Sequence, residues 1–301
     1  MAAVDNSSSL ALRGTLRTHE PLSRHTAWAI GGPADRFYEP ADLDDLSVFL
    51  ATLDRDEPLF WLGLGSNLLV RDGGIRGTVV HLANALSAIE RIGADSVRVE
   101  AGVACPKLAR FCAREDLSGA EFMAGIPGTI GGALAMNAGA FGGETYDIVV
   151  GVETMARDGS RFQHRGEDID TAYRYVDVPT GQWFVAAHFQ LQSGVRSDSE
   201  QRIRELLRQR AQSQPIGTRN CGSVFRNPAN DHAARLIEQC GLKGERIGDA
   251  QVSLKHANFI INIANARAAD VEALIALIVE RVRSECDVQL IPEVRVVGEV
   301  Q

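Results

Sequence analysis

The sequence predicts an α+β protein with more than one domain. The chain has 301 residues, enough for two or three domains of common size. Short apolar runs typical of strands alternate with helical patterns, in an order that is not a simple repeat. The pattern changes near Val149, where a strand hairpin is predicted, and again at a strongly charged helical stretch from Ser197 to Gln214, beside which we place the main domain boundary.

The first elements are predicted from apolar spacing and from breaks. Residues 34–53 predict a strand, a break at Pro40 and a helix. Five apolar side chains share one face of that helix: Leu43, Leu46, Phe49, Leu50 and Leu53. Residues 58–70 predict a buried strand that runs into a tight turn, and residues 78–82 predict another strand.

The middle of the chain predicts a further strand at residues 96–103 and a short helix opened by Pro106. Three side chains of that helix are expected to face inward: Leu108, Phe111 and Cys112. Residues 149–163 predict a hairpin that turns at Asp158-Gly159. The charged stretch that follows predicts a helix with a narrow apolar stripe formed by Ile203, Leu206 and Leu207.

The last hundred residues predict two helices and two strands. One helix is expected to start at Asp231 and to stop at Gly241, and the other to start at Asp270 as its N-cap and to run to about Glu285. Residues 255–265 and 288–300 predict the strands.

The composition is that of an ordinary globular protein, with 45% apolar and 23% charged residues. The formal net charge of −8 is spread along the chain, which disfavours a nucleic-acid backbone or an acidic membrane as the main partner. No run of about 18 apolar residues exists. We therefore expect no nucleic-acid partner and no membrane insertion, no obligate protein partner is evident, and any anion must be bound by a local site.

The cysteines and the first residues favour a cytoplasmic protein. The five cysteines form no C-x-x-C pair, which suggests reduced thiols rather than a disulfide framework or a thiolate zinc site. The seven histidines suggest no metal set either. The opening MAAVDNSSSL lacks the features of a signal peptide, so a short frayed N-terminus is expected.

Two glycine-rich stretches indicate a site for a diphosphate. They are GLGSN, from Gly63 to Asn67, and the longer stretch from Gly125 to Glu144. Glycines bare backbone N–H groups, so a phosphate can approach without meeting a Cβ atom, although tight turns and close packing also use them. Neither stretch ends in the Gly-Lys-Ser/Thr of a P-loop, and GLGSNL lacks the third glycine of a Rossmann fingerprint. The alternative is a cradle built from two loops that converge on one ligand.

The segment CGSVFRNP, from Cys221 to Pro228, combines a hydroxyl, an aromatic ring, a guanidinium and an amide. Its Gly222 and its Asn227-Pro228 pair are ordinary turn chemistry, so on its own the segment predicts a turn.

Six motifs in order give a more specific indication. They are GLGSNLLVRDGG, GIPGTIGGALAMNAGAFGGE, AYRY, CGSVFRNP, KHANFIIN and LIPEVRVVGE. Together they resemble the UDP-N-acetylenolpyruvoylglucosamine reductase (MurB) family over roughly Thr26 to Glu299. The resemblance implies a vanillyl-alcohol-oxidase-type FAD-binding fold of two α+β subdomains, followed by an α+β substrate-binding domain. On that basis we expect FAD-binding subdomains at 1–85 and 86–200 and the substrate-binding domain at 201–301.

The resemblance also implies the reaction. NADPH reduces bound FAD, and the reduced flavin converts the enolpyruvyl ether of UDP-N-acetylglucosamine to the lactyl ether of UDP-N-acetylmuramate, a step of peptidoglycan precursor synthesis. In the family, NADPH and the UDP-sugar visit one active site by turns. Both carry a diphosphate, which helps them to share it.

The matching motif positions imply roles for individual residues. Hydride addition to the terminal alkene carbon leaves negative charge on the adjacent carbon and its carboxylate, so the site needs a stabilising charge and a proton donor. Ser223 corresponds to the proton donor, and Arg174 with Glu293 to the pair that orients and stabilises the enolate. Expected FAD contacts are Gly63, Gly65, Ser66, Asn67, Ile126, Pro127, Gly128, Thr129, Gly131, Asn137 and Gly139. Expected substrate contacts are Asn227, Lys243 and Lys255, with Arg246 as a further candidate, whereas His256 and Asn258 are expected to be structural.

Other interpretations of these residues remain open. Arg174 would also suit a solvated strand, and Glu293 an edge strand whose charge discourages aggregation. The motif AYRYVDVP lacks the serine that many relatives carry two residues after the arginine, and Asp249 stands where a glycine is commoner. Only a short stretch, Tyr175 to Val185, is expected between Arg174 and the next strand, which is similar to the branch that lacks a long tyrosine-bearing lid.

Two rival functions fit the same fold. The chain could be a flavin oxidase acting on another small substrate, although CGSVFRNP and IPEVR argue against this. It could instead be a non-catalytic nucleotide-binding module, although the complete set of Ser223, Arg174 and Glu293 argues against that.

Overall fold

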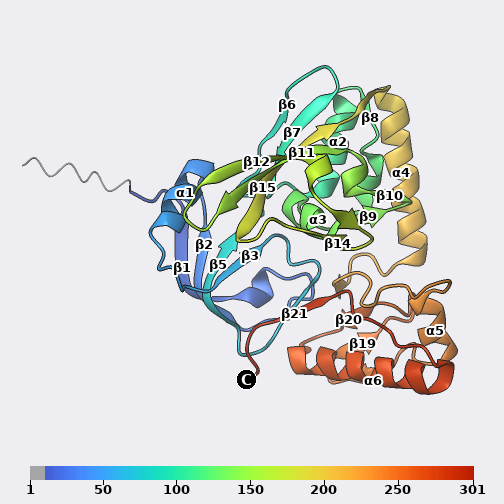
Figure 1. Ribbon diagram of the computed structural model, residues 1–301. Coiled ribbons are helices and arrows are strands. Elements are labelled where there is room, and N and C mark those ends of the chain that lie inside the picture. The colour runs from blue at the N-terminus through green and yellow to red at the C-terminus, as the bar shows by residue number, and fades with distance from the viewer. Residues whose placement is uncertain (1–10) are drawn as a thin grey trace, which may run out of the picture.

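A computed structural model describes residues 11–301, arranged mainly around three sheets (Figure 1). The residues for which we expected a frayed N-terminus, 1–10, lie outside the described part.

The first sheet has the strand order β1-β2-β5-β3. Its strands are β1 (Thr15–Pro21), β2 (Pro33–Glu39), β5 (Ile75–His81) and β3 (Leu59–Leu62). Helix α1 (Leu43–Ala51) packs on it and buries Leu46, Phe49 and Leu50, which confirms the predicted helix and its face. The ring of Tyr38 stacks on that of Phe49 with the ring centroids 3.6 Å apart. Strand β1 was not predicted, because its side chains are mostly polar and exposed.

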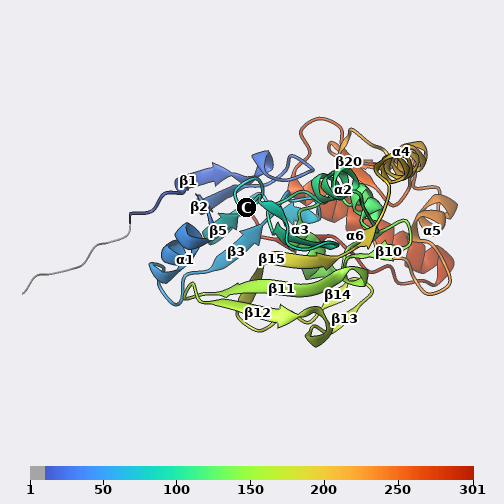
Figure 2. The same ribbon diagram turned by 90° about the horizontal axis from the view of Figure 1, so that it is seen from above.

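The second sheet is antiparallel throughout and has the order β12-β11-β15-β7-β6. Its strands are β6 (Ile89–Arg91), β7 (Ser96–Glu100), β11 (Val149–Ala156), β12 (Arg161–Arg165) and β15 (Gln182–Gln190). Helices α2 (Cys105–Arg114) and α3 (Ile130–Met136) lie on one side of it (Figure 2). The predicted 149–163 hairpin and its turn are confirmed.

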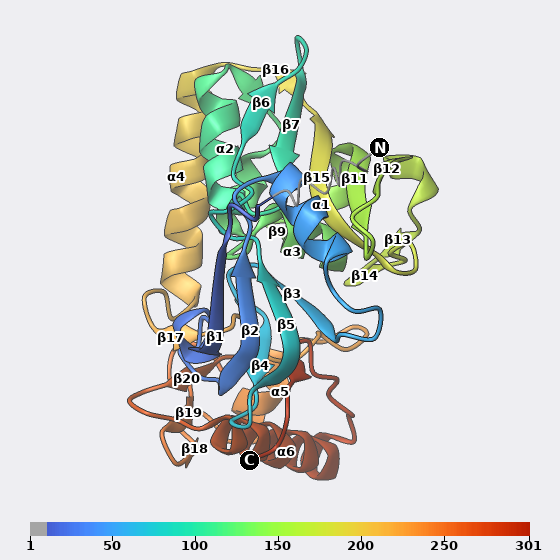
Figure 3. The same cartoon turned by 90° about the vertical axis from the view of Figure 1, so that its left-hand side faces the viewer.

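Helix α4 (Arg196–Ser213) lies beside α2 and extends toward the third sheet (Figure 3). Ile203 and Leu206 are buried and Leu207 packs against the same core, so the predicted stripe is confirmed.

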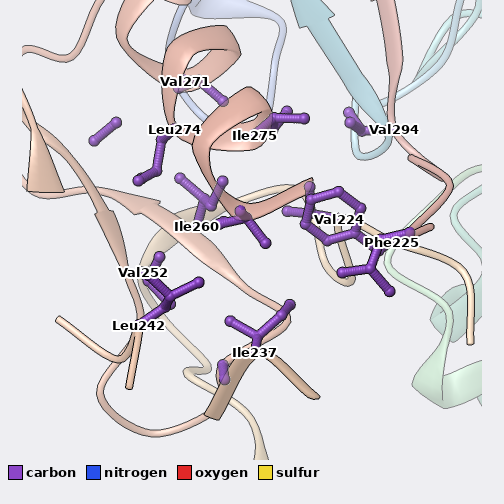
Figure 4. Packing of buried hydrophobic residues seen from close by; sticks show 14 of the residues in the cluster. Val224, Phe225, Ile237, Leu242, Val252, Ile260, Val271, Leu274, Ile275 and Val294 are labelled. Atoms are coloured by element: carbon purple, nitrogen blue, oxygen red, sulfur yellow. The ribbon is translucent and has the colours of Figure 1, made fainter. Parts of the chain in front are cut away.

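The third sheet has the order β17-β20-β19-β18. Its short strands are β17 (Arg219–Asn220), β18 (Arg246–Ile247), β19 (Ala250–Val252) and β20 (Ile260–Asn262). The core beneath it includes Val224, Phe225, Ile260, Leu274 and Val294 (Figure 4). The predicted strand at 255–265 is therefore present only in its centre, since a turn and the residues around Asn258 occupy its start.

Two helices complete this part, and both start at other residues than predicted. Helix α5 (Ala233–Gln239) begins two residues after Asp231. Helix α6 (Ala268–Cys286) has Arg267 as its N-cap, so the prediction that Asp270 is the N-cap is wrong. Asp270 lies in the first turn instead, where its carboxylate accepts the N–H of Arg267.

The C-terminal strand returns to the N-terminal part of the chain. Strand β21 (Arg295–Val297) pairs in parallel with β4 (Leu68–Val70). Trp28 also enters the C-terminal core, and its indole N–H donates to the carbonyl of Ile260 at 2.8 Å. These contacts bring the segment before β4, which is GLGSN, next to the segment before β21, which is LIPEV.

The remaining strands form two-stranded pairs, and 3₁₀ turns lie in several of the connections of the fold. The pairs are β8 (Leu117–Ser118) with β16 (Gln192–Ser193), β9 (Gly139–Ala140) with β10 (Gly143–Glu144), and β13 (Thr171–Ala172) with β14 (Tyr175–Val176). The 3₁₀ turns are η1 (Leu22–Arg24), η2 (Glu121–Gly125), η3 (Thr145–Asp147) and η4 (Gly166–Asp168).

Candidate active site

The two glycine-rich loops lie against each other, as the converging-cradle interpretation requires. A Cβ atom added at Gly63 would stand 2.4 Å from the Oγ1 of Thr129, and one added at Gly128 would stand 3.4 Å from the Oγ of Ser66. The first distance is too short for any residue with a side chain. Glycine at 63 therefore allows the loops to meet.

The first glycine-rich loop also packs closely against residues 25–27. Gly65 has φ +57°, and an added Cβ would lie 2.3 Å from the carbonyl oxygen of His25. The N–H of Ala27 donates to the carbonyl of Gly65 at 3.1 Å. A left-handed backbone with no space for a side chain explains the glycine at this position.

A cavity of about 320 Å³ opens where the loops meet. Leu64, Ser66 and Pro127 line it from the two loops, Gly222 lines it from CGSVFRNP, and Asn220 lines it from the position just before that segment. Bare backbone and a hollow of this size fit part of a dinucleotide.

Not every predicted cofactor residue faces this cavity. An added Cβ at Gly131 would meet Ala101 at 3.0 Å, and one at Gly139 would meet the carbonyl of Gly143 at 2.6 Å. Ile126 is buried. Close packing accounts for these three residues in the structure.

Arg174 and Glu293 form a partly buried ion pair. The Nε of Arg174 lies 2.8 Å from the Oε1 of Glu293, and the two side chains are only 17% and 14% exposed. Arg174 occupies the tip of the β13–β14 hairpin with φ +58°, and the ring of Tyr173 lies 5.0 Å from its guanidinium carbon. Arg174 is thus not a solvated strand residue, and Glu293 is not an exposed edge charge.

Asn137 lies next to Arg174 and contacts it through its backbone carbonyl. It has φ +42° and is 3% exposed. Its Nδ2 donates to Glu144 at 2.7 Å, and its Oδ1 accepts the N–H of Tyr146 at 3.2 Å. Its backbone carbonyl accepts an Nη1–H of Arg174 at 3.4 Å. Both ends of the side-chain amide are therefore engaged within the protein.

Asn67 connects the first glycine-rich loop to Glu293. Its Nδ2 donates to the backbone carbonyl of Glu293 at 3.1 Å, and its own carbonyl accepts the N–H of Arg295 at 3.1 Å. Sequence patterns indicated Asn67 only as a cofactor contact. Its link to Glu293 depends on the β4–β21 pairing, which no local pattern signals.

Ser223 lies beside the same segment. The carbonyl of its neighbour Val224 accepts the N–H of Glu293 at 2.7 Å. Asn258 holds the next residue, because its Oδ1 accepts the N–H of Phe225 at 2.9 Å and its Nδ2 donates to the carbonyl of Phe225 at 2.8 Å. The predicted structural role of Asn258 is thus seen directly. Within residues 11–301 the hydroxyl of Ser223 makes no hydrogen bond, so it is free to serve a ligand.

The predicted substrate residues are more dispersed. Asn227 is exposed, and its Oδ1 accepts the N–H of Ala233 at the start of α5. Lys243 pairs with Glu238 at 2.7 Å, and the Nζ of Lys255 donates to the carbonyl of Ala211. None of the three contacts the Arg174–Glu293 pair.

Comparison with known proteins decides the family. The family "UDP-N-acetylenolpyruvoylglucosamine reductase, C-terminal domain" matches residues 214–297, and the family "FAD binding domain" matches residues 34–164. The UDP-N-acetylenolpyruvoylglucosamine reductase of Methylococcus capsulatus is 58% identical over 96% of this chain and 95% of its own length, and that of Nitrosococcus oceani is 56% identical over 97% and 98%. The chain belongs to the UDP-N-acetylenolpyruvoylglucosamine reductase family.

A solved structure agrees with this assignment. The crystal structure of the reductase (MurB) from Thermus caldophilus matches with a TM-score of 0.81 and 35% identity, covering 95% of this chain and 99% of that one. The predicted family, fold class and FAD cofactor are therefore confirmed.

The structure also explains one departure from the family pattern. Asp249 accepts the N–H of Asn265 at 3.0 Å and pairs with Arg246, so its carboxylate joins the β18–β19 turn to the loop after β20. Arg246, a further substrate candidate, is thereby engaged within the reductase fold.

Two general features concern the described part of the chain. Among residues 11–301, no helix is long and apolar enough to cross a membrane. The same residues contain no cluster of three or more histidine, cysteine or acidic side chains that could hold a metal ion.

Proposed function

We propose that this chain is an NADPH-dependent flavoenzyme that reduces the enolpyruvyl ether of UDP-N-acetylglucosamine enolpyruvate to UDP-N-acetylmuramate. The relatives at 58% and 56% identity carry the name of this reductase. The observation that carries the proposal is the partly buried Arg174–Glu293 pair, held by backbone contacts beside the Ser223 hydroxyl, which makes no hydrogen bond within residues 11–301.

FAD, when bound, supplies the hydride for this reduction. The residues proposed to hold it are those of the two loops, Gly63, Gly65, Ser66 and Asn67 with Ile126 to Thr129, supported by Gly131, Asn137 and Gly139. The bare backbone at Gly63 and Gly65 and the cavity beside Ser66 support this assignment.

Three residues are proposed to stabilise the negative charge that develops on the substrate and to supply the proton: Arg174, Glu293 and Ser223. Hydride addition leaves negative charge on the carbon bearing the ether oxygen and on its carboxylate. The guanidinium of Arg174 would stabilise that carboxylate-derived enolate, and Glu293 would hold the guanidinium in orientation. The Ser223 hydroxyl would donate the proton to the carbon. Serine is a weak acid, so the donation requires a strongly basic carbanion and a fixed hydroxyl.

The remaining roles belong to the same proposal. Asn227, Lys243 and Lys255 would contact the UDP-sugar, with each lysine leaving its present partner to do so. Segments 1–85 and 86–200 would hold FAD, and 201–301 the substrate. The reaction would serve peptidoglycan precursor synthesis in the cytoplasm, and the short segment after Arg174 would leave the site without a long lid.

The proposal is tested by substituting the proton donor. Ser223→Ala should lower turnover of the UDP-sugar by about 10²–10⁴-fold, because general acid catalysis contributes that much. Reduction of the flavin by NADPH should stay within about twofold, since no proton from Ser223 is needed there. Stopped-flow absorbance at the flavin band measures both half-reactions, with the exposed Ser197→Ala as the matched control. Equal losses in both half-reactions would rule out the assigned role.

A further inference from the structure

Arg210 is a cation in the wall of the cavity, and within residues 11–301 it has no acidic partner. It lies in the last turn of α4, and the cavity is shared with Ser66 and Pro127 of the two glycine-rich loops. Its Nε donates to the Oε1 of Gln214 at 2.8 Å, which fixes the direction of the side chain. Gln214 is neutral, so this bond leaves the charge uncompensated.

Burial lowers the pKa of Arg210, and no acidic group among residues 11–301 acts in the other direction. This differs from Arg196 at the start of the same helix, which pairs with Glu200 at 2.6 Å. An arginine keeps its charge under all ordinary conditions. A partly buried guanidinium without an anion is unfavourable, so the site is incomplete without a negative ligand.

The cavity wall shows what kind of anion fits. Its other lining residues are apolar, small or neutral, and none is acidic. A guanidinium presents a planar set of donors that matches two phosphate oxygens at once. Across the cavity, the glycine-rich loops offer a hydroxyl and bare backbone to the same group. The arrangement therefore suits a diphosphate held from two sides.

We infer that Arg210 binds the diphosphate of FAD and holds it against the loops that carry Ser66 and Pro127. The inference rests on the FAD site described under Proposed function. FAD is favoured over the visiting UDP-sugar and NADPH because Ser66 and Pro127 lie inside the matched FAD-binding segment, 34–164. Arg210 precedes the matched C-terminal domain, 214–297, so the contact joins the cofactor to the connection between the two parts.

The test is a binding titration that does not depend on turnover. Apo-protein is titrated with FAD and, separately, with riboflavin, which lacks the diphosphate, and quenching of flavin fluorescence gives each Kd. Arg210→Met should weaken FAD by about 10- to 100-fold, the usual effect of losing a charge-assisted contact. Riboflavin affinity should change by less than about twofold. The FAD Kd of Arg210→Lys should lie between those of the native protein and Arg210→Met. An ammonium keeps the positive charge but cannot make the paired hydrogen bonds of a guanidinium.

Arg208→Met is the matched control, since Arg208 is exposed on the same helix and the charge change is identical. It should leave both Kd values unchanged. If Arg210→Met does not fold, the Lys variant and the salt dependence of FAD binding to the native protein carry the test. Native FAD affinity should then fall with added KCl.

Two results would overturn the inference: an unchanged FAD Kd, or an equal loss of riboflavin affinity. An unchanged FAD Kd together with a raised KM for both NADPH and the UDP-sugar would assign Arg210 to the visiting diphosphates. A failure of the proposed reductase reaction would leave the titration unaffected, so the two proposals can fail separately.

Discussion

At the scale of single residues, Arg174 combines an unfavourable backbone conformation with a partly buried contact. A φ of +58° is uncommon for a residue with a side chain. Such conformations persist where surrounding contacts impose them, and they cluster at functional sites. Here the imposing contacts are the Glu293 carboxylate and the carbonyl of Asn137. The backbone at the tip of the β13–β14 hairpin thus places the Arg174 guanidinium against Glu293.

Arg174→Lys tests whether the planar guanidinium is required. An ammonium can keep the charge near Glu293 but cannot make a fork on a carboxylate. We expect the rate of UDP-sugar reduction to fall by about 10²-fold or more, in line with the loss of an oriented charge contact, while flavin reduction by NADPH is nearly normal. Rapid-mixing kinetics of the two half-reactions measure this. The control is Arg165→Lys, which alters an exposed arginine paired with Asp168. Unchanged kinetics in Arg174→Lys would contradict the proposed role of Arg174 in stabilising the enolate.

Residue patterns alone could indicate the three proposed active-site residues only through motifs. A lone arginine between tyrosines, or a glutamate after a proline, has no local feature that separates it from a surface residue. Arg210 and the second role of Asn67 were not indicated at all. Both depend on contacts between distant segments, which spacing within a segment does not report.

At the scale of elements, α6 begins with a cap from another part of the fold. The carboxylate of Asp72 accepts the N–H groups of Ala268 and Ala269 at 3.1 and 3.3 Å. Free N–H groups at a helix start need such acceptors. This explains why the helix starts earlier than Asp270, the residue that a local capping pattern predicts.

Asp72→Ala should therefore destabilise the protein without touching the site. Removal of a capping side chain costs about 0.5–2 kcal/mol of unfolding free energy. Urea denaturation followed by circular dichroism measures the change. Asp56→Ala, an exposed aspartate, serves as the control and should change stability little. Equal midpoints for Asp72→Ala and the native protein would show that water replaces the cap without loss.

The contact between the glycine-rich loops offers a second element-scale prediction. Gly63→Ala would place a methyl group 2.4 Å from the Thr129 hydroxyl, so the loops must separate. We expect FAD affinity to fall by about tenfold or more, because overpacking shifts the backbone that frames the site. The Kd is measured by flavin fluorescence. Gly93→Ala, where a Cβ has ordinary contacts at 3.6 Å, is the control. Undiminished FAD affinity in Gly63→Ala would argue against a cradle formed by both loops.

At the scale of the whole molecule, the order and type of the long elements were predictable because each carries its own apolar period. The return of β21 to β4 was not, since parallel pairing between the two ends of a chain has no local signal. The same limit applies to Trp28, which belongs by sequence to the first part and by packing to the C-terminal core. The site lies where these long-range contacts meet.

The stability of the whole molecule should depend on pH through Glu153. The bidentate contact from Arg98, with both N–O distances 2.7 Å, lowers the pKa of Glu153, and His188 adds a further contact. A depressed pKa gives stability that is present above the unfolded-state value, about 4.3, and is lost as pH falls through the folded value. Glu153→Gln should cost about 1–3 kcal/mol at pH 7 and should flatten the loss of stability below about pH 4.3.

Urea midpoints measured from pH 7 to pH 3 provide the comparison. Exposed Glu167→Gln is the control, because that carboxylate is 69% exposed and should leave the profile unchanged. Parallel profiles for the native protein and Glu153→Gln would mean that other carboxylates dominate acid unfolding.

In the proposed reaction, one site passes electrons from NADPH through FAD to the enolpyruvyl ether. The most direct measurement is anaerobic: the flavin of the purified protein is bleached with NADPH, and the enolpyruvyl UDP-sugar is then added in known amounts. We expect the oxidised flavin spectrum to return in proportion to the sugar added. A flavin that stays bleached until air enters would contradict it, and would assign the fold to a flavin oxidase with another electron acceptor.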